Sequence, residues 1–134
     1  MAFHPEDRVV ASCSAHDSIK LWNLDDGGLI STMKVDDIMV SSVVYSPDGS
    51  KLAAAHYKTV SIFNMETNEV LCTVSCDSPV YSIDWHDNRL VAGCDDGTIQ
   101  VFDAQSGDRL STVNVGYAFS RFSTRISLPA RPLF

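Results

Sequence analysis

The chain has 134 residues, of which 45% are hydrophobic and 20% are charged, and its formal net charge at pH 7 is −7. This composition is typical of a single soluble globular domain, and the excess of carboxylates disfavours binding to the phosphate backbone of nucleic acids. No run of 18 apolar residues is present, and Glu6 and Asp7 stand where a secretory signal would carry basic residues. We therefore expect neither a membrane span nor a signal peptide.

The first third of the chain predicts β-strands separated by turns. Met1 to Phe3 would form the end of a strand, and His4-Pro5-Glu6-Asp7 would form a turn. The Asp26-Gly27-Gly28 segment is typical of a hairpin turn because Gly permits the backbone conformations that turns require. The strands expected around these turns are Val9–Cys13, Ile19–Trp22 and Leu29–Val35.

Two further sets of four strands follow. The middle set comprises Val40–Tyr45, Lys51–Ala55, Val60–Phe63 and Val70–Val74, and the last set comprises Val80–Trp85, Arg89–Ala92, Thr98–Phe102 and Arg109–Val115. Their apolar runs are almost continuous and show no helical periodicity, which is typical of strands covered on both faces. Stacked sheets provide that environment.

One short segment occurs three times. Ser18-Ile19-Lys20-Leu21-Trp22-Asn23 recurs as Thr59-Val60-Ser61-Ile62-Phe63-Asn64 and as Thr98-Ile99-Gln100-Val101-Phe102-Asp103, at spacings of 41 and 39 residues. A period of about 40 residues indicates a repeat architecture, in which each unit buries its apolar face against a neighbour.

These repeats resemble WD-repeat β-propeller blades. The resemblance rests on Tyr45-Ser46-Pro47-Asp48-Gly49, on the small residues Ala11–Ser14, and on Ala92–Asp103 with its aromatic residue followed by Asp. It implies an all-β fold of three four-stranded antiparallel blades, at residues 1–35, 36–75 and 76–115, with 116–134 as a divergent tail. Closed propellers have about four to eight blades, so the ring would not close, and we expect a fragment or truncated isoform of a longer protein.

WD repeats often contain a buried His, Ser, Asp and Trp set, and the resemblance assigns parts of it to this chain. In the first blade Ser14 and Trp22 would be retained and His16 would stand at the Asp position, whereas the second blade would retain only an aromatic residue, Phe63. In the third blade the expected members are Cys76 and Cys94 in place of His and Ser, Asp96, and Phe102 in place of Trp.

Two expectations follow for the third blade. The backbone amides of its own turn should satisfy Asp96. Cys76 and Cys94 should lie close together, either as two inert buried thiols or as a pair that oxidation can join. The four cysteines contain no C-x-x-C pair, which favours reduced thiols and a cytoplasmic location, with the nucleus as the alternative.

The sequence offers no catalytic motif. It contains no G-x-S-x-G turn and no phosphate-binding Gly loop, and its four histidines lack the spacing of a metal site. The paired aspartates lie in separate turns without the alternating spacing of a calcium loop. We therefore predict a protein that is not an enzyme and carries no cofactor or metal.

In propellers that this chain resembles, partners commonly bind the face formed by the loops before the first strand and between the second and third strands. Here those loops and their borders carry Ile38, Met39, Ser41, Tyr57, Asp77 and Tyr81. Apolar and aromatic residues beside carboxylates suit a basic, partly apolar peptide. Ile38 and Met39 would alternatively hold the blades together.

The favoured function is a non-catalytic scaffold that mediates protein–protein interaction, without nucleic-acid or membrane binding. Alternatives are the sensor or regulatory propeller of a larger enzyme or nucleotide-binding protein, and a truncated product without independent function. The open blade faces also leave self-association as an expectation. For stability, we predict that Trp22→Ala costs several kcal/mol, of the order seen for large aromatic truncations, and that His4→Ala is nearly neutral.

Overall fold

The computed structural model describes residues 1–13, 18–34 and 40–115, and these residues form an all-β structure. Three four-stranded antiparallel sheets contain consecutive strands, so the predicted fold class is confirmed. The strands are β1 (Ala2–Phe3), β2 (Val9–Cys13), β3 (Ser18–Asn23), β4 (Leu29–Lys34), β5 (Val40–Tyr45), β6 (Lys51–His56), β7 (Thr59–Asn64), β8 (Val70–Ser75), β9 (Val80–His86), β10 (Arg89–Cys94), β11 (Thr98–Asp103) and β12 (Arg109–Asn114).

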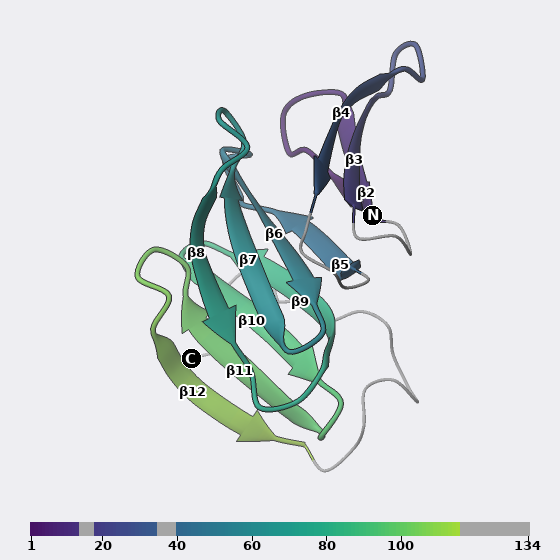
Figure 1. Ribbon diagram of the computed structural model, residues 1–134. Helices are drawn as coiled ribbons and strands as arrows, with labels where there is room; N and C mark the ends of the chain where they lie inside the picture. The colour runs from purple at the N-terminus through teal and green to yellow at the C-terminus, as the bar shows by residue number, and fades with distance from the viewer. Residues whose placement is uncertain (14–17, 35–39, 116–134) are drawn as a thin grey trace.

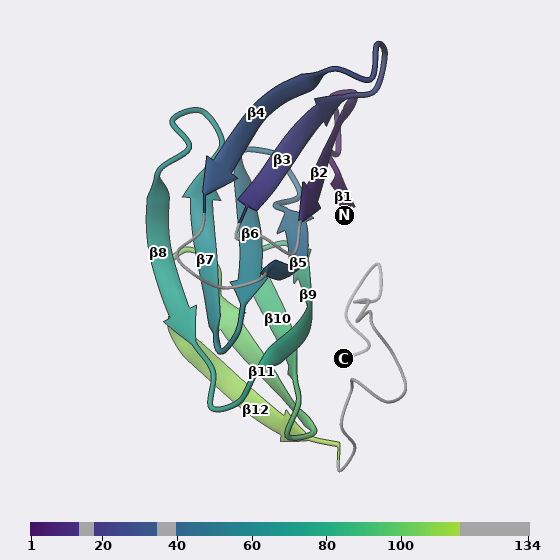
Figure 2. The same ribbon diagram turned by 45° about the vertical axis from the view of Figure 1, so that its right-hand side comes forward.

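The sheets are called blade 1 (β1–β4), blade 2 (β5–β8) and blade 3 (β9–β12), and they do not close a ring. Blade 2 lies between the other two (Figure 1). The strands β4, β8 and β12 follow one side of the stack and β1, β5 and β9 the other (Figure 2). The division of the chain at residues 35 and 75 remains our proposal, and the tail 116–134 lies outside the described residues.

Strand β6 explains why the apolar runs are continuous. Its side chains alternate between two core clusters: Ala53 and Ala55 pack with blade 3, whereas Leu52 and Ala54 pack with blade 1. Successive residues of a strand point to opposite faces of its sheet. A strand buried on both faces therefore needs apolar residues at every position.

Each blade presents a row of large side chains to the blade before it. In blade 2, cross-strand register places Tyr45, Leu52 and Phe63 side by side, and all three pack against blade 1. In blade 3, the corresponding row of Trp85, Leu90 and Phe102 packs against blade 2. In blade 1 the row consists of Phe3, Val10, Trp22 and Leu29.

The row of blade 1 faces away from blade 2. Ile19 and Leu21 of β3 belong to the core shared with blade 2, so Trp22, the next residue, points to the opposite face. Phe3 is 68% exposed and Leu29 is 52% exposed on this face. Phe3 is thus largely uncovered, whereas its counterparts Tyr45 and Trp85 in blades 2 and 3 are buried.

The Asn or Asp that ends each repeated segment shapes the turn that follows. The side-chain oxygens of Asn23, Asn64 and Asp103 each accept a hydrogen bond from the amide two residues later, at 2.8, 2.8 and 2.9 Å. Residues four positions later, Gly27, Asn68 and Gly107, have positive φ and donate their amides back to the same residue's carbonyl. The repeated Asn or Asp therefore encodes a hydrogen-bonded turn.

His4 helps to join blade 1 to blade 2. Its Nδ1 accepts hydrogen bonds from the amides of Glu6 and Asp7, and its ring meets the Tyr45 ring edge-on at 5.0 Å between centroids. The same ring lies against Gly49 in the β5–β6 turn, and its side chain is only 14% exposed. These contacts argue against the nearly neutral His4→Ala substitution that the sequence suggested.

Candidate interaction surface

The indole of Trp22 keeps one of the predicted polar partners, although the serine differs from the one expected. Its Nε1 donates to Ser12 Oγ at 2.9 Å. Ser12 lies opposite Lys20, two residues from Trp22 on the same face of the sheet, whereas Ser14 follows the end of β2. Ser12 is therefore the partner that the structure gives to the indole, and the predicted Ser14 and His16 lie outside the described residues.

In the other two blades, the residue ten positions before the aromatic residue is Ala53 for Phe63 and Ala92 for Phe102. The assignment of Cys94 to the serine place of the set remains a prediction. Since alanine has no hydrogen-bonding group, the donor-free ring of phenylalanine is its consistent neighbour.

Cys76 and Cys94 lie together, as expected. Both are buried in the core between blades 2 and 3, and their thiols hydrogen-bond to each other. The hydrogen bond from Cys76, with further ones from Thr98 and Ser78, lowers the pKa of Cys94. Donating to Cys94, together with burial, raises the pKa of Cys76. As a thiol, Cys94 also donates a long bond of 4.0 Å to the Ala92 carbonyl.

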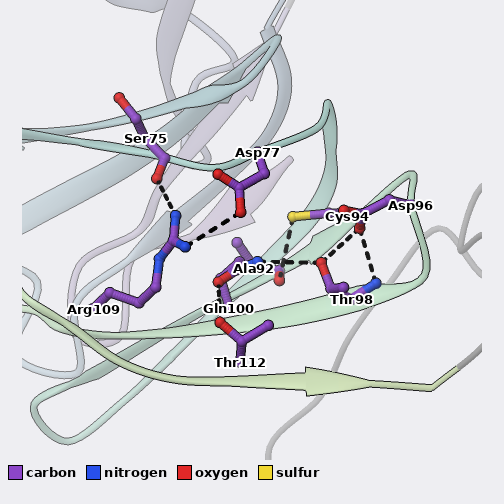
Figure 3. Close-up of polar contacts among 9 residues, drawn as sticks. All are labelled: Ser75, Asp77, Ala92, Cys94, Asp96, Thr98, Gln100, Arg109 and Thr112. Carbon is purple, nitrogen blue, oxygen red and sulfur yellow. Dashed lines mark hydrogen bonds and ion pairs between the residues drawn. The ribbon is translucent and has the colours of Figure 1, made fainter.

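Asp96 is satisfied within its own turn, as predicted. Its Oδ1 accepts from the backbone amide of Thr98 at 3.0 Å and from the Thr98 hydroxyl at 2.6 Å (Figure 3). Its amide donates to the Ser78 hydroxyl at 3.2 Å, which ties the turn to the segment before β9. These hydrogen bonds, chiefly the one from the Thr98 hydroxyl, lower the pKa of Asp96.

Of the six residues predicted to bind a partner, Ile38 and Met39 lie outside the described residues. Ser41 has a structural role in the described part of the chain. Its hydroxyl donates to the Val80 carbonyl of blade 3 at 2.8 Å and lies 3.3 Å from the Ala55 carbonyl. Ser41 therefore links two blades. This role accounts for a polar residue at this position without invoking a partner protein.

Tyr57 is presented at the β6–β7 turn. It has a φ of 56°, its side chain is half exposed, and the Lys58 ammonium lies 5.5 Å from its ring centroid. The turn is anchored to the segment before β9, because the Tyr57 carbonyl accepts from the Val80 amide and the Lys58 carbonyl accepts from the Cys76 amide, both at 2.7 Å. The aromatic ring thus projects from a fixed backbone.

Asp77 lies in the same segment and faces blade 3. Its carboxylate is 3.4 Å from Arg109 Nη1, and Arg109 Nη2 donates to the Ser75 carbonyl at 3.0 Å (Figure 3). The Arg109 guanidinium also lies 5.9 Å from the Phe102 ring centroid. These three contacts fix the position of Arg109. Its ion pair with Asp77 in turn orients the Asp77 carboxylate, which remains exposed at the junction of the two blades.

Tyr57, Lys58, Asp77 and Tyr81 together define what we call the seam surface. Tyr81 follows Val80 directly in β9 and is partly exposed. The two backbone hydrogen bonds between the Tyr57-Lys58 turn and the 76–80 segment bring these residues to one junction of blades 2 and 3. Two tyrosines and an aspartate therefore project from backbone segments that these hydrogen bonds hold together.

Sequence reasoning missed a groove along the inner strands. Residues of β1, β5 and β9 line an open cavity of about 580 Å³, with hydroxyls from Ser41, Ser42 and Ser82 and the carboxylate of Asp84 on its walls. The only sequence signal for it is the serine near the start of β5 and β9. Stacking of the three sheets creates the groove.

Among the described residues, no helix is long and apolar enough to cross a membrane. Within residues 1–13, 18–34 and 40–115, no three His, Cys, Asp or Glu side chains come together as a metal site would require. The absence of a cofactor remains a prediction.

Three stacked four-stranded antiparallel sheets, of which the second and third each pack an aromatic row on the sheet before them, are blades of a β-propeller. The chain belongs to the WD-repeat family: the WD domain, G-beta repeat, matches residues 1–23, 27–64 and 68–103. These matches include strands of all three blades and end before β12.

Several WD-repeat proteins are similar to this chain. Eukaryotic translation initiation factor 3 subunit I of Pyricularia oryzae is 26% identical over 83% of the chain and 37% of its own length. WD repeat-containing protein SL1-17 of Schistosoma mansoni is 33% identical over 80% of the chain and 36% of its own length. The p21-activated protein kinase-interacting protein 1-like of Danio rerio is 25% identical over 79% of the chain and 29% of its own length. The chain thus spans about a third of the length of these relatives.

Proposed function

We propose that this protein is a non-catalytic scaffold whose seam surface binds a basic, partly apolar segment of a partner protein. The observation that carries the proposal is the placement of Tyr57 and Tyr81 beside Asp77 on a backbone fixed by hydrogen bonds between two blades. A preorganised surface loses little conformational entropy when a partner binds. Aromatic residues are also enriched at the energetic centres of protein interfaces.

Charge selects the chemistry of the partner. Asp95 and Asp96 lie next to the seam surface, because the Asp95 amide donates to the Pro79 carbonyl at 2.8 Å and the Asp96 amide donates to Ser78. With Asp77 they place three carboxylates at the junction of blades 2 and 3, against the two cations Arg109, which pairs with Asp77, and Lys58, which lies beside Tyr57, in a chain of net charge −7. Such a surface attracts Lys and Arg side chains and repels acidic segments.

The names of the relatives support an interaction role. One is a subunit of a translation initiation factor and another is a kinase-interacting protein. We extend to this chain only the general role of a protein that assembles with other proteins. A cytoplasmic location, with the nucleus as the alternative, belongs to the same proposal.

The experiment uses the whole chain and an array of immobilised peptides that combine Lys or Arg with aromatic or aliphatic residues. Matched peptides with Asp or Glu in place of the basic residues provide the charge control. We expect binding only to the basic peptides, with a dissociation constant that rises about tenfold in Asp77→Asn and Tyr81→Ala, the loss typical of residues at the centre of an interface. Tyr57→Asn should act similarly and tolerates the positive φ at this position.

Leu71→Ala is the matched control variant, because Leu71 is exposed to a similar degree on the outer strand β8. It should bind as the native chain does. Equal binding of basic and acidic peptides would show that the proposed surface is wrong. So would three seam variants that all bind the basic peptides with the affinity of the native chain.

A second candidate function is self-association through the uncovered row of blade 1. Phe3, Val10 and Trp22 lie in register across the sheet, in the positions that pack on a neighbouring blade elsewhere in the molecule, and Leu29 is exposed beside Trp22. The occupant we propose is the outer face of blade 3 of a second copy. Val101 there corresponds to Leu21 of blade 1 and Ile62 of blade 2, which receive the row of the next blade.

Sedimentation velocity over a range of concentrations tests this contact. The native chain should form dimers or longer head-to-tail assemblies, and Phe3→Ser with Leu29→Ser should remain monomeric. Leu71→Ser controls for the loss of an exposed apolar residue elsewhere. A native chain that is monomeric at all concentrations, or a double variant that assembles equally, would count against the second copy.

A further inference from the structure

Two buried thiols lie in the core beside the seam surface. Cys76 follows the last strand of blade 2, and Cys94 ends β10 of blade 3. Cys94 is fully buried, Cys76 is 6% exposed, and the two side chains hydrogen-bond to each other. Both are free thiols in this structure.

We propose that Cys76 and Cys94 form a reversible oxidation site, in which a hydroperoxide joins them in a disulfide bond between the segment before β9 and the end of β10. The proposal stands on the placement of the two residues and does not depend on the seam surface binding a partner. The Asp95 and Asp96 amides donate to Pro79 and to Ser78, which holds the end of β10 against the segment that begins at Cys76, and both thiols belong to one core cluster. A disulfide requires its two Cβ atoms within about 4.5 Å.

The chemistry of the pair divides into attack and resolution. Cys94 is the first to lose its proton, because it accepts hydrogen bonds from Cys76, Thr98 and Ser78 that favour its thiolate. The Cys94 thiolate attacks one peroxide oxygen, the O–O bond breaks, and Cys94 becomes a sulfenic acid while the other oxygen leaves as an alcohol or as water after protonation. The sulfur atom of Cys76 then attacks that of Cys94, the S–O bond breaks, and the departing hydroxide takes the thiol proton of Cys76 as water.

Hydrogen peroxide accounts for the electrons and protons that the two thiols lose. The two thiols lose two electrons and two protons, and hydrogen peroxide gains them to become two molecules of water. An added dithiol restores the two thiols by exchange, starting at the more accessible Cys76.

The other two cysteines serve as internal controls. Cys13 lies in β2 of blade 1, and Cys72 lies in β8, where burial raises its pKa. Neither has a thiol partner among the interactions that the described residues show. After oxidation of the pair, both should still react with an alkylating reagent once the protein is unfolded.

The test treats the full native chain with hydrogen peroxide and then alkylates it in denaturant. We expect an intact mass lower by two hydrogens before alkylation, two remaining alkylated thiols, and one peptide crosslink between Cys76 and Cys94 that a dithiol removes. The Cys13→Ser/Cys72→Ser variant should form the same crosslink, and Cys76→Ser should convert Cys94 to stable oxyacids instead.

The native chain alone decides the question if a variant does not fold. Four reactive thiols after oxidation, or a crosslink that involves Cys13 or Cys72, would overturn the proposal. Oxidation of Cys94 to sulfinic acid in the native chain without a crosslink would also overturn it, because Cys76 would then have failed to resolve the sulfenic acid.

Discussion

Gly49→Ala tests the joint between blades 1 and 2. Gly49 has a φ of 76°, and an added Cβ would overlap the Nε2 and Cε1 atoms of the His4 ring and lie 3.0 Å from its Cδ2. The ring cannot move freely, because two amides hydrogen-bond to its Nδ1 and Tyr45 packs against it. The substitution therefore strains the turn and also displaces His4.

The magnitude follows from these two parts. The left-handed conformation destabilises a residue that has a Cβ by about 1–2 kcal/mol. Displacing His4 forfeits about 0.5–1.5 kcal/mol for the aromatic pair and about 1 kcal/mol for the two hydrogen bonds, whose exposed amides water rehydrates. We expect Gly49→Ala to lower the free energy of unfolding by about 3–4 kcal/mol in total.

Gly27→Ala is the matched control. Gly27 has a φ of 72°, and an added Cβ would have nothing within 4 Å, so only the backbone penalty of about 1–2 kcal/mol applies. Urea unfolding followed by circular dichroism measures both variants. In a His4→Ala background the cost of Gly49→Ala should fall to that of Gly27→Ala. Equal costs of the two glycine variants in the native background would refute the role assigned to His4.

Three further predictions concern the core, the turns and the blade contacts. Phe102→Ala should lower the free energy of unfolding by about 3–5 kcal/mol. Trp22→Ala should lower it by roughly half as much in dilute protein, because Trp22 lies on the uncovered face of blade 1. Equal unfolding midpoints of the two variants would contradict the orientation given to blade 1. Hydrogen bonds from the Ser50 amide and the Ser50 and Ser46 hydroxyls lower the pKa of Asp48 from 3.8 to about 2. Ionised Asp48 therefore stabilises the fold above about pH 4, and this contribution is lost as the pH falls through about 2, so the stability gap between the native chain and Asp48→Asn should shrink over that range in urea melts. Ser41→Ala removes the hydrogen bond to Val80 and should cost about 1 kcal/mol by the same assay, and an unchanged midpoint would show that the hydroxyl does not join the blades.

Local sequence patterns predicted the strands and turns closely. The third strand of blade 2, expected at Val60–Phe63, is Thr59–Asn64 in the structure, and the turn at Asp87-Asn88 is present, with positive φ at Asp87. Such features depend on residues adjacent in the chain, on backbone conformation and on side-chain alternation. The sequence therefore contained sufficient information for them.

The candidate site was predicted less completely. The resemblance placed Tyr57, Asp77 and Tyr81 on loops, and the structure brings them to one junction. The structure pairs the Trp22 indole with Ser12, two residues before the predicted Ser14, and a sequence pattern does not distinguish two residues that would share one face of a strand. Ser41 seemed suited to a partner, whereas its hydroxyl is used by the next blade.

The sequence by itself determined that this protein is built of repeated four-stranded units, because the hydrophobic alternation and the turn-forming Asn and Asp residues act within one unit. Tertiary structure alone decided which groups meet across units: His4 with Gly49, and Tyr57 with the segment before β9. These pairs depend on how one twisted sheet stacks on the next. Their separation in the chain carries no signal of their contact, since packing between sheets fixes it.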